Sequence, residues 1–315
     1  MTVTVVGSVA FDSLETPFGR RDRILGGAAT HFSLAASMFT DVRVVGVVGD
    51  DFGSDELDRF HAKGIDTTDL ERVIGAQSFF WEGRYDNDMQ VAHTIETQLN
   101  VFADFDPKLS EASRNASMVF LANIQPDLQR GVREQCADAR CTGLDSMNYW
   151  IESARESLLK TLSGVDVVML NDAEVRMLTG EPNLKTAAAQ LRGHGPRVLV
   201  IKQGSYGACM CTDEGFFFVP GMPLDRVVDP TGAGDAFAGG FFGYLDSHAH
   251  GDPFDEASLR RAAAYGSVMA SFAIEDFGSG QLERVSHAEV VERCAEFQRL
   301  TAFDHLAARE REPAR

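Results

Sequence analysis

The stretch Val228-Asp229-Pro230-Thr231-Gly232-Ala233-Gly234-Asp235-Ala236-Phe237-Ala238-Gly239-Gly240 is the most informative part of this sequence. Its small residues at 232–234 leave backbone N–H groups uncovered, and the small apolar residues from Ala236 to Leu245 predict a buried helix. Free N–H groups and the positive end of the helix dipole would converge at this turn, which is a ready site for an anion. The stretch therefore predicts a phosphate site at the start of a helix.

Asp235 lies in the first turn of this predicted helix. A carboxylate so close to a phosphate would repel it, and its position is explained if it acts as the base for a hydroxyl that attacks the phosphorus. The combination indicates phosphoryl transfer to an alcohol.

Composition sets the bounds of the prediction. The length of 315 residues fits one α/β domain with a small appendage as well as two domains. A hydrophobic content of 44% and a charged content of 24% are typical of a soluble globular protein. The net charge of −18 disfavours nucleic acid and membrane partners, because both are bound by clusters of Lys and Arg.

The five cysteines are few and odd in number, which favours a reducing compartment. Cys209 and Cys211 have the spacing of one face of a strand, and we favour buried thiols over a metal site because no second Cys or His pair accompanies them. The N-terminus lacks the basic start of a signal peptide, and no apolar run is long enough to span a membrane. We therefore expect a cytoplasmic protein.

The pattern along the chain predicts alternating strands and helices. Strands are expected at 2–9 and 42–48 and helices at 28–39 and 54–63, and from residue 117 strand–helix units repeat, including one helix near 151–162. Such units imply a mostly parallel sheet covered on both faces. An antiparallel pair is expected at 206–211 and 215–219, helices follow residue 234, and a polar tail begins at 301. The aromatic and polar segments 78–85 and 89–97 predict an exposed hairpin that serves as a flap.

Polar residues follow several predicted strands, at the edge where α/β sheets bind ligands. They are Asp12, Asn123, Asp145, Asn148 and Asn171. Asp and Asn also cap helices and form turns, so each of them has a structural alternative. Asn171 and Glu174 have the spacing of a capping box, and they equally suit Mg²⁺ held through water.

Two further glycine-containing segments belong to this edge. Gly26 and Gly27 open a helix and would admit a ligand close to the backbone, or would serve only helix packing. Lys202 precedes Gly204 and Gly207 and would meet either a phosphate or solvent. The chain has no Walker P-loop, no G-x-G-x-x-G after its first strand, no H-E-x-x-H and no G-x-S-x-G, which disfavours the enzyme classes that use them.

The segment from Asp229 to Gly240 resembles the C-terminal signature of the ribokinase-like (PfkB) carbohydrate kinase family, with Pro230 at a position often held by Thr. Gly26-Gly27-Ala28, Asp145-Ser-Met-Asn148, Asn171-x-x-Glu174 and Gly204-x-x-Gly207 occur in family order. The resemblance covers residues 2 to about 280. It implies one domain at about 1–300, with a Rossmann-like three-layer α/β core, a mostly parallel sheet and a small β lid from about 12–25 and 78–97.

The resemblance also implies roles for individual residues. Asp235 would be the catalytic base, and the backbone of Gly232, Ala233 and Gly234 would form the anion hole. ATP would be the donor, with Mg²⁺ held through water by Asn171 and Glu174, and Asp229 would take part in a site for a monovalent cation such as K⁺. Lys202, Gly204, Gly207 and Thr231 would border the nucleotide. The residues expected to contact the acceptor are Asp12, Gly26, Gly27, His31, Asn123 and Arg84.

This chain departs from the sugar kinases of the family at one acceptor position. His31 stands where those members often have Asn, and imidazole donates and accepts hydrogen bonds differently. The lid segment is also rich in aromatic residues, Phe79, Phe80, Trp81 and Tyr85, which would either stack on a nucleobase or pack beneath the lid.

The expected function is therefore ATP-dependent phosphorylation of a hydroxyl of a ribose-like sugar or a hexose. The alternatives are a nucleoside kinase of the adenosine, cytidine or inosine type, and a ligand-binding homologue without catalysis. An oxidoreductase is disfavoured by the missing dinucleotide fingerprint. The lid strands of this family often pair between subunits, so a homodimer through them is a further expectation.

Overall fold

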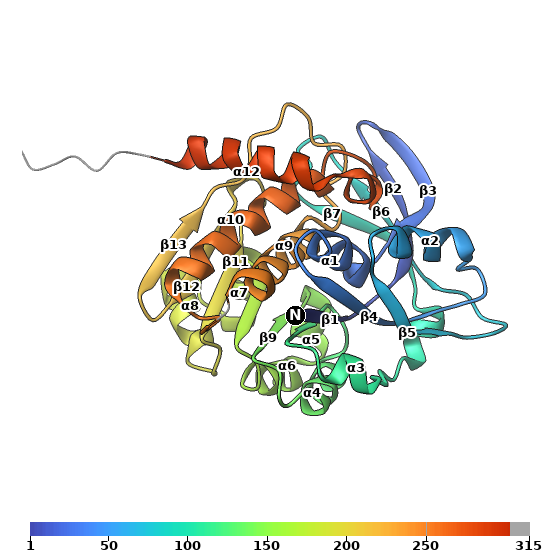
Figure 1. Ribbon diagram of the computed structural model, residues 1–315, viewed down its shortest axis with the longest axis horizontal. Helices are drawn as coiled ribbons and strands as arrows, with labels where there is room; N and C mark the ends of the chain where they lie inside the picture. Colours follow the sequence, from blue (N-terminus) through green and yellow to red (C-terminus); the bar gives the residue numbers. More distant parts are fainter. Residues whose placement is uncertain (250, 303–315) are drawn as a thin grey trace, which may run out of the picture.

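A nine-stranded sheet runs through the centre of the computed structural model, which describes residues 1–249 and 251–302 (Figure 1). The strand order is β13-β12-β11-β10-β9-β8-β1-β4-β5. Neighbouring strands from β5 to β11 are parallel, and β12 is antiparallel to both of its neighbours. The bounds are β1 Thr2–Val6, β4 Asp41–Val48, β5 Asp66–Arg72, β8 Met118–Leu121, β9 Cys141–Asp145, β10 Val167–Asn171, β11 Val198–Lys202, β12 Ala208–Thr212 and β13 Gly215–Val219.

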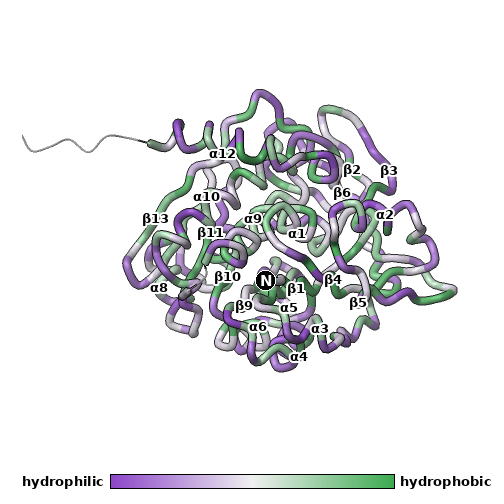
Figure 2. Tube along the Cα trace, viewed as in Figure 1, coloured by the Kyte–Doolittle hydropathy of each residue, from purple (hydrophilic) through white to green (hydrophobic). Residues whose placement is uncertain are grey.

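Helices cover both faces of this sheet and complete the three layers. One face carries α1 (Ala28–Ala36), α2 (Ser54–Ala62), α9 (Ala233–His248) and α10 (Glu256–Ala273), with α11 (Gly280–Arg284) and α12 (His287–Thr301) beside them. The other face carries α4 (Pro126–Gln135), α5 (Asn148–Ser153), α6 (Arg155–Leu162), α7 (Asp172–Thr179) and α8 (Leu184–Arg192). Figure 2 shows the hydrophobic residues gathered mainly in the inner strands and helices. None of the described helices is long and apolar enough to cross a bilayer.

Aromatic packing holds α9 against the sheet. The rings of Phe120 in β8 and Phe242 in α9 lie 5.2 Å apart, and Phe120 stacks on Phe32 of α1 at 4.5 Å. A Cβ on Gly143 in β9 would lie 2.2 Å from the ring of Phe242, so only glycine leaves space for this contact. Arg140 donates to the carbonyls of Asp246 and Ala249 at the far end of the helix. The C-terminal half of α9 is therefore fixed relative to the sheet.

A second sheet of four strands forms the lid, in the order β3-β2-β6-β7. Its strands are β2 (Ala10–Thr16), β3 (Gly19–Gly26), β6 (Phe79–Tyr85) and β7 (Ala92–Gln98). The β2–β3 and β6–β7 pairs are antiparallel, and a parallel pairing of β2 with β6 joins the two segments into one sheet. Figure 1 shows this lid sheet beside α1. The small β lid expected from the sequence is therefore present as a separate sheet.

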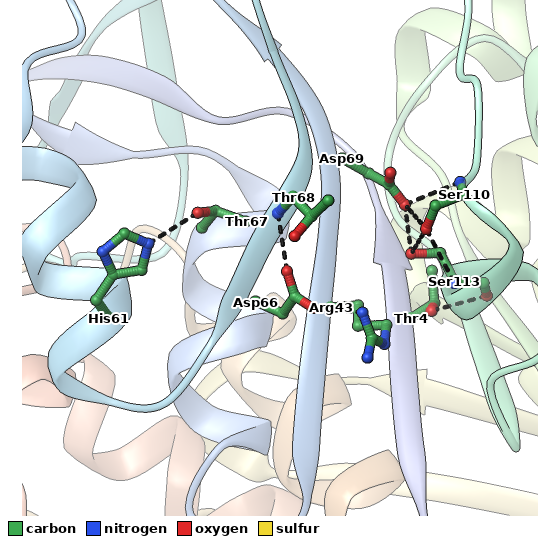
Figure 3. Close-up of polar contacts among 9 residues, drawn as sticks. All are labelled: Thr4, Arg43, His61, Asp66, Thr67, Thr68, Asp69, Ser110 and Ser113. Atoms are coloured by element: carbon green, nitrogen blue, oxygen red, sulfur yellow. Dashed lines mark hydrogen bonds and ion pairs between the residues drawn. The ribbon is translucent and has the colours of Figure 1, made fainter.

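The chain that returns from the lid is tied to the edge of the large sheet. It forms the 3-10 helix η1 (Asn100–Asp104) and α3 (Glu111–Arg114), and Asp69 of β5 accepts hydrogen bonds from Ser110 and Ser113 of this segment. Thr4 of β1 donates to the carbonyl of Ser113 (Figure 3). These contacts lie midway along β1 and β5, and they anchor the lid connection to the body of the large sheet.

Three local expectations differ from the structure. The strand β5 was not predicted, because its sequence Asp-Thr-Thr-Asp-Leu-Glu-Arg carries few apolar residues and forms an edge. The single helix expected near 151–162 is broken into α5 and α6 at Ala154, whose φ of −139° and ψ of 32° are not helical. Of the predicted polar tail, Thr301 ends α12, and residues 303–315 lie outside the described residues.

Candidate active site

The turn before α9 has the geometry of an anion site. Gly232 is the N-cap of α9 with a φ of +75°, a conformation that residues with a side chain rarely adopt. Within the described part of the chain, the N–H groups of Gly232 and Gly234 have no hydrogen-bond partner, whereas that of Ala233 lies 3.3 Å from the carbonyl oxygen of Pro230. The turn therefore presents free donors at the positive end of a 16-residue helix.

Asp235 projects from the first turn of α9 and is only partly buried. Its pKa is raised from the usual value to about 7, chiefly by burial and then by the nearby Asp145, while Lys202 acts in the opposite direction. A carboxylate with a pKa near neutrality is well suited to accept a proton from an alcohol.

Lys202, at the carboxyl end of β11, lies inside a group of carboxylates. Its Nζ donates to Oδ2 of Asp145 at 2.6 Å, and only 17% of the side chain is exposed. Burial alone would lower the pKa of Lys202, but Asp145, Glu174 and Asp235 outweigh it and raise the pKa. A Cβ on Gly234 would lie 2.9 Å from this Nζ. Lys202 is therefore beside the 232–234 turn, and of the two alternatives for it, contact with solvent alone is not what the structure shows.

Asn171 and Glu174 form the capping box of α7. Glu174 N–H donates to Asn171 Oδ1 at 2.8 Å, and Asn171 N–H donates to Glu174 Oε2 at 2.7 Å. Burial, followed by Asp145, raises the pKa of Glu174 to about 7, against the effect of Lys202. The capping interpretation is confirmed. The capping box uses only Oε2 of Glu174, and Oε1 makes no hydrogen bond to any described residue.

This donor set fits Mg²⁺ only as a water-mediated site. No group of three or more His, Cys, Asp or Glu side chains that could hold a metal occurs among residues 1–249 and 251–302. One carboxylate oxygen and the phosphates of a nucleotide suit Mg²⁺, which commonly keeps several of its waters. The pair Cys209 and Cys211, like Cys136 and Cys141, consists of buried free thiols.

The double glycine brings the lid against the body of the protein. A Cβ on Gly26 would lie 1.9 Å from Oδ2 of Asp12, and one on Gly27, whose φ is +96°, would lie 2.5 Å from the carbonyl oxygen of Ser8. Asp12 is 4% exposed, and burial, with further contributions from Asp229 and Asp235, raises its pKa to about 8. Neither glycine could be replaced without moving this carboxylate or the backbone.

His31 packs directly against the phosphate turn. Its ring occupies the space where a Cβ on Gly232 would lie, 2.3 Å from the nearest ring atom. The residue is 1% exposed, and neither ring nitrogen has a partner among the described residues. Burial lowers the pKa of His31 to about 4, so the imidazole is neutral at neutral pH. It offers one donor and one acceptor at the inner wall of the site.

The inner face of the lid carries an aromatic surface next to Asp12. Trp81 in β6 and Asp12 in β2 are partners in register, so their side chains project from the same face. A Cβ on Gly83 would lie 2.1 Å from the indole ring, which shows that Trp81 lies flat across this glycine. Tyr85, on the same face, reaches Thr231 with 3.1 Å between its hydroxyl oxygen and Thr231 Oγ1.

Some predicted residues are not brought into this cluster. Arg84 has a side chain that is 51% exposed and lies 3.7 Å from Asp86, on the opposite face of β6 from Tyr85. Asn123 is half-buried, donates to Met147 Sδ and accepts from Trp150 Nε1 at 3.0 Å. The expected acceptor contact of Arg84 thus has no support in its placement.

The remaining predicted residues hold the loops around the turn. Asp229 accepts from the N–H groups of Thr231 and Gly278, at 2.9 and 2.8 Å. Gly204 and Gly207 both have positive φ, and a Cβ on Gly207 would lie 2.1 Å from the carbonyl oxygen of Val219. Asp145 was predicted as a strand-end residue and as part of the Asp145-Ser-Met-Asn148 motif, without a role of its own, and its pairing with Lys202 makes it a central charge of the site.

Residues 5–284 match the sequence pattern of the family described as pfkB family carbohydrate kinase. The chain belongs to this family. A cytidine kinase of Thermococcus kodakarensis is 29% identical over 261 residues, which are 81% of this chain and 91% of that protein. An ATP-dependent ribose-1-phosphate kinase of Halopiger xanaduensis is 28% identical over 218 residues, 69% of this chain and 71% of the relative. This pfkB member is an ATP-dependent carbohydrate or nucleoside kinase.

The fold of this kinase agrees with solved structures. The crystal structure of the nucleoside kinase of Methanocaldococcus jannaschii superimposes with a TM-score of 0.77 at 19% identity, and the match covers 94% of this chain and 98% of the other. This likeness establishes the ribokinase-like fold of the pfkB kinase.

Proposed function

We propose that this kinase transfers the terminal phosphoryl group of Mg·ATP to the primary hydroxyl of a nucleoside. The observation that carries the proposal is the register of the lid, in which the Asp12 carboxylate and the Trp81 indole are neighbours on one face. A carboxylate binds the vicinal hydroxyls of a ribose, and an indole stacks on a base. A free sugar would bind to the carboxylate but would have no base to stack on the indole.

The charge of the site supports an uncharged acceptor. Asp12, Asp229 and Asp235 are close enough for the last two to raise the pKa of Asp12, and the nearby cation, Lys202, is paired with Asp145. A sugar that already bears a phosphate would meet carboxylates on the acceptor side of the turn. The argument therefore favours a nucleoside over a phosphorylated sugar.

The residues divide the reaction between them. Asp235 takes the proton of the attacking hydroxyl, and the N–H groups of the 232–234 turn together with Lys202 meet the charge that develops on the transferred group. Mg²⁺, held through water by Glu174 and Asn171, would neutralise the phosphates of the donor. Gly204, Gly207 and Thr231 would border the nucleotide, and the neutral His31 would orient the acceptor beside the turn.

Three further parts of the proposal concern the setting of the enzyme. We expect a cytoplasmic protein, since all five cysteines are free thiols. We expect a homodimer through the lid, because β7 is exposed along its whole length. The Asp229 carboxylate already accepts hydrogen bonds from two backbone N–H groups. A K⁺ ion near Asp229 would therefore be bound mainly by backbone carbonyl oxygens.

A panel of acceptors tests the proposed substrate class. ADP release would be measured with cytidine, adenosine, inosine, ribose, fructose and ribose 1-phosphate, and kcat/KM is expected to be highest for a nucleoside. A higher value for any free or phosphorylated sugar would overturn the nucleoside assignment. Asp235→Asn is expected to keep ATP binding and to lose about 10²–10⁴-fold in kcat, and retained turnover would remove Asp235 from its role.

A further inference from the structure

The lid touches the phosphate turn through one polar contact surrounded by apolar ones. Tyr85 from β6 and Leu14 from β2 pack with Val228, which precedes the turn, and with Phe277, which follows α10. Within this cluster the hydroxyl oxygen of Tyr85 lies 3.1 Å from Oγ1 of Thr231. Thr231 immediately precedes Gly232, the residue with positive φ that begins the anion site.

Thr231 is also the first member of a chain of backbone contacts behind the turn. Its N–H donates to Asp229 Oδ1, and Asp229 Oδ2 accepts from the N–H of Gly278. The carbonyl of Ile274 accepts from the N–H of Val228 at 2.8 Å. The position of Thr231 therefore depends on the lid from one side and on the segment after α10 from the other.

Burial favours the hydrogen bond between the Tyr85 hydroxyl and Thr231. Tyr85 is 9% exposed, and burial raises its pKa beyond the usual value. A buried hydroxyl that loses its partner pays the cost of desolvation without compensation. When the lid lifts, both hydroxyls regain water, but Thr231 loses the contact that fixes it on the lid side.

We propose that Tyr85 is a positioning residue that couples closure of the lid over the acceptor to alignment of the 232–234 turn. With the lid closed, the Tyr85 hydroxyl holds Thr231, and the N–H groups that follow it are aimed at the transferred phosphoryl group. With the lid open, the turn lacks this support, which disfavours transfer to water before an acceptor is bound. This inference rests on the proposed role of the turn in phosphoryl transfer.

The test removes each hydroxyl separately and then both together. Tyr85→Phe and Thr231→Val are each expected to lower kcat with the best acceptor between about threefold and tenfold, the effect of one hydrogen bond. For Tyr85→Phe the KM for ATP is expected to stay unchanged. The double variant should be no slower than the slower single variant, because both changes remove the same contact. Thr231→Ser keeps the hydroxyl and should restore most of the rate.

Tyr244→Phe is the matched control. Tyr244 is 6% exposed on α9, stacks on Tyr265 at 4.4 Å, and its hydroxyl makes no hydrogen bond to the described residues. It should leave kcat unchanged. Wild-type rates in Tyr85→Phe, or effects that multiply in the double variant, would overturn the coupling. If Tyr85→Phe melts much earlier than the control, the comparison of Thr231→Ser with Thr231→Val decides instead, and equal rates for those two variants would overturn it. Activity retained in Asp235→Asn would refute the proposed function and leave these rate ratios measurable.

Discussion

Lys202 and Asp145 form a buried ion pair, 2.6 Å between Nζ and Oδ2, that bridges the ends of β11 and β9 on either side of β10. The two residues act on Asp235 with opposite signs, since Asp145 raises its pKa and Lys202 lowers it. The pair therefore tunes the proposed base while it keeps a cation beside the phosphate turn.

Removing the two partners one at a time should move the pH profile in opposite directions. Lys202→Met should raise the pKa of Asp235 above about 7, and Asp145→Asn should lower it. Both variants will be slower than the wild type, so the midpoint of the acidic limb of kcat/KM is the measurement that matters. Shifts of both midpoints in the same direction would contradict this assignment.

The wild-type enzyme should lose activity as the pH falls below neutrality. Asp235, the proposed base, can accept a proton only when it is ionised, and its pKa is raised to about 7. The ratio kcat/KM for the acceptor should level off above about pH 8, where Asp12 is ionised as well as Asp235, and should fall by at least tenfold per pH unit well below pH 7. A flat profile between pH 5.5 and pH 8 would mean that another group accepts the proton.

Gly232→Ala should abolish turnover and destabilise the fold. The added Cβ would meet the His31 ring at 2.3 Å and would impose a positive φ on alanine. Gly64→Ala is the matched control, because Gly64 has a φ of +70° and open space around its Cβ position. The control should cost about 1 kcal/mol of unfolding free energy and no activity. Equal melting temperatures for the two variants would show that His31 yields to the new side chain.

Asp12→Asn should stabilise the protein at alkaline pH. A carboxyl group whose pKa is raised to about 8 on folding binds its proton more tightly in the folded state. The free energy of unfolding therefore falls as the pH rises from about 4 to about 8. The variant avoids this loss and should gain at least about 1.4 kcal/mol over the wild type at pH 8.5, the value of one pKa unit.

The gain from Asp12→Asn should shrink to near zero at pH 3.5, below the ordinary pKa of the carboxyl group. Denaturant unfolding at the two pH values measures it. A gain that is the same at both values would trace the effect to packing rather than to charge.

Trp81→Leu should separate binding of the acceptor from binding of the donor. The indole lies over Gly83 beside Asp12, so its loss should raise KM for a nucleoside about tenfold, the effect of one lost stacking contact. The KM for ATP and the rate with free ribose should change little. An equal rise of KM for nucleoside and for ATP would indicate a general collapse of the lid.

Local patterns were sufficient to predict much of this architecture. The glycine turn at the start of α9, the capping box of Asn171 and Glu174, and the strand pair within 78–97 each depend on residues that are close in sequence, and the structure contains all three features. Family resemblance added the order of the motifs and the lid.

Features that depend on the order of strands in space were beyond sequence reasoning. The pairing of Lys202 with Asp145 exists because β9 and β11 flank β10, which no spacing between residues 145 and 202 reveals. The outward direction of Arg84 follows from its alternation with Tyr85 in β6, but which face of β6 points inward is set by its pairing with the distant strand β2. The polar edge strand β5 carries no apolar pattern to detect.

The parallel pairing of β2 with β6 has a consequence for how the enzyme is made. Ala10 in β2 pairs with Gly26 of the adjacent β3, but its parallel partner in β6 is Phe79, so the four-stranded sheet cannot be completed while a ribosome has delivered only the first strands. Its outer strand β7 is exposed throughout, so the pairing of β7 with β6 buries little surface. Amide protons of β7 should therefore exchange with solvent well before those of β8 and β10, and proteases should nick the nascent or heated enzyme there first.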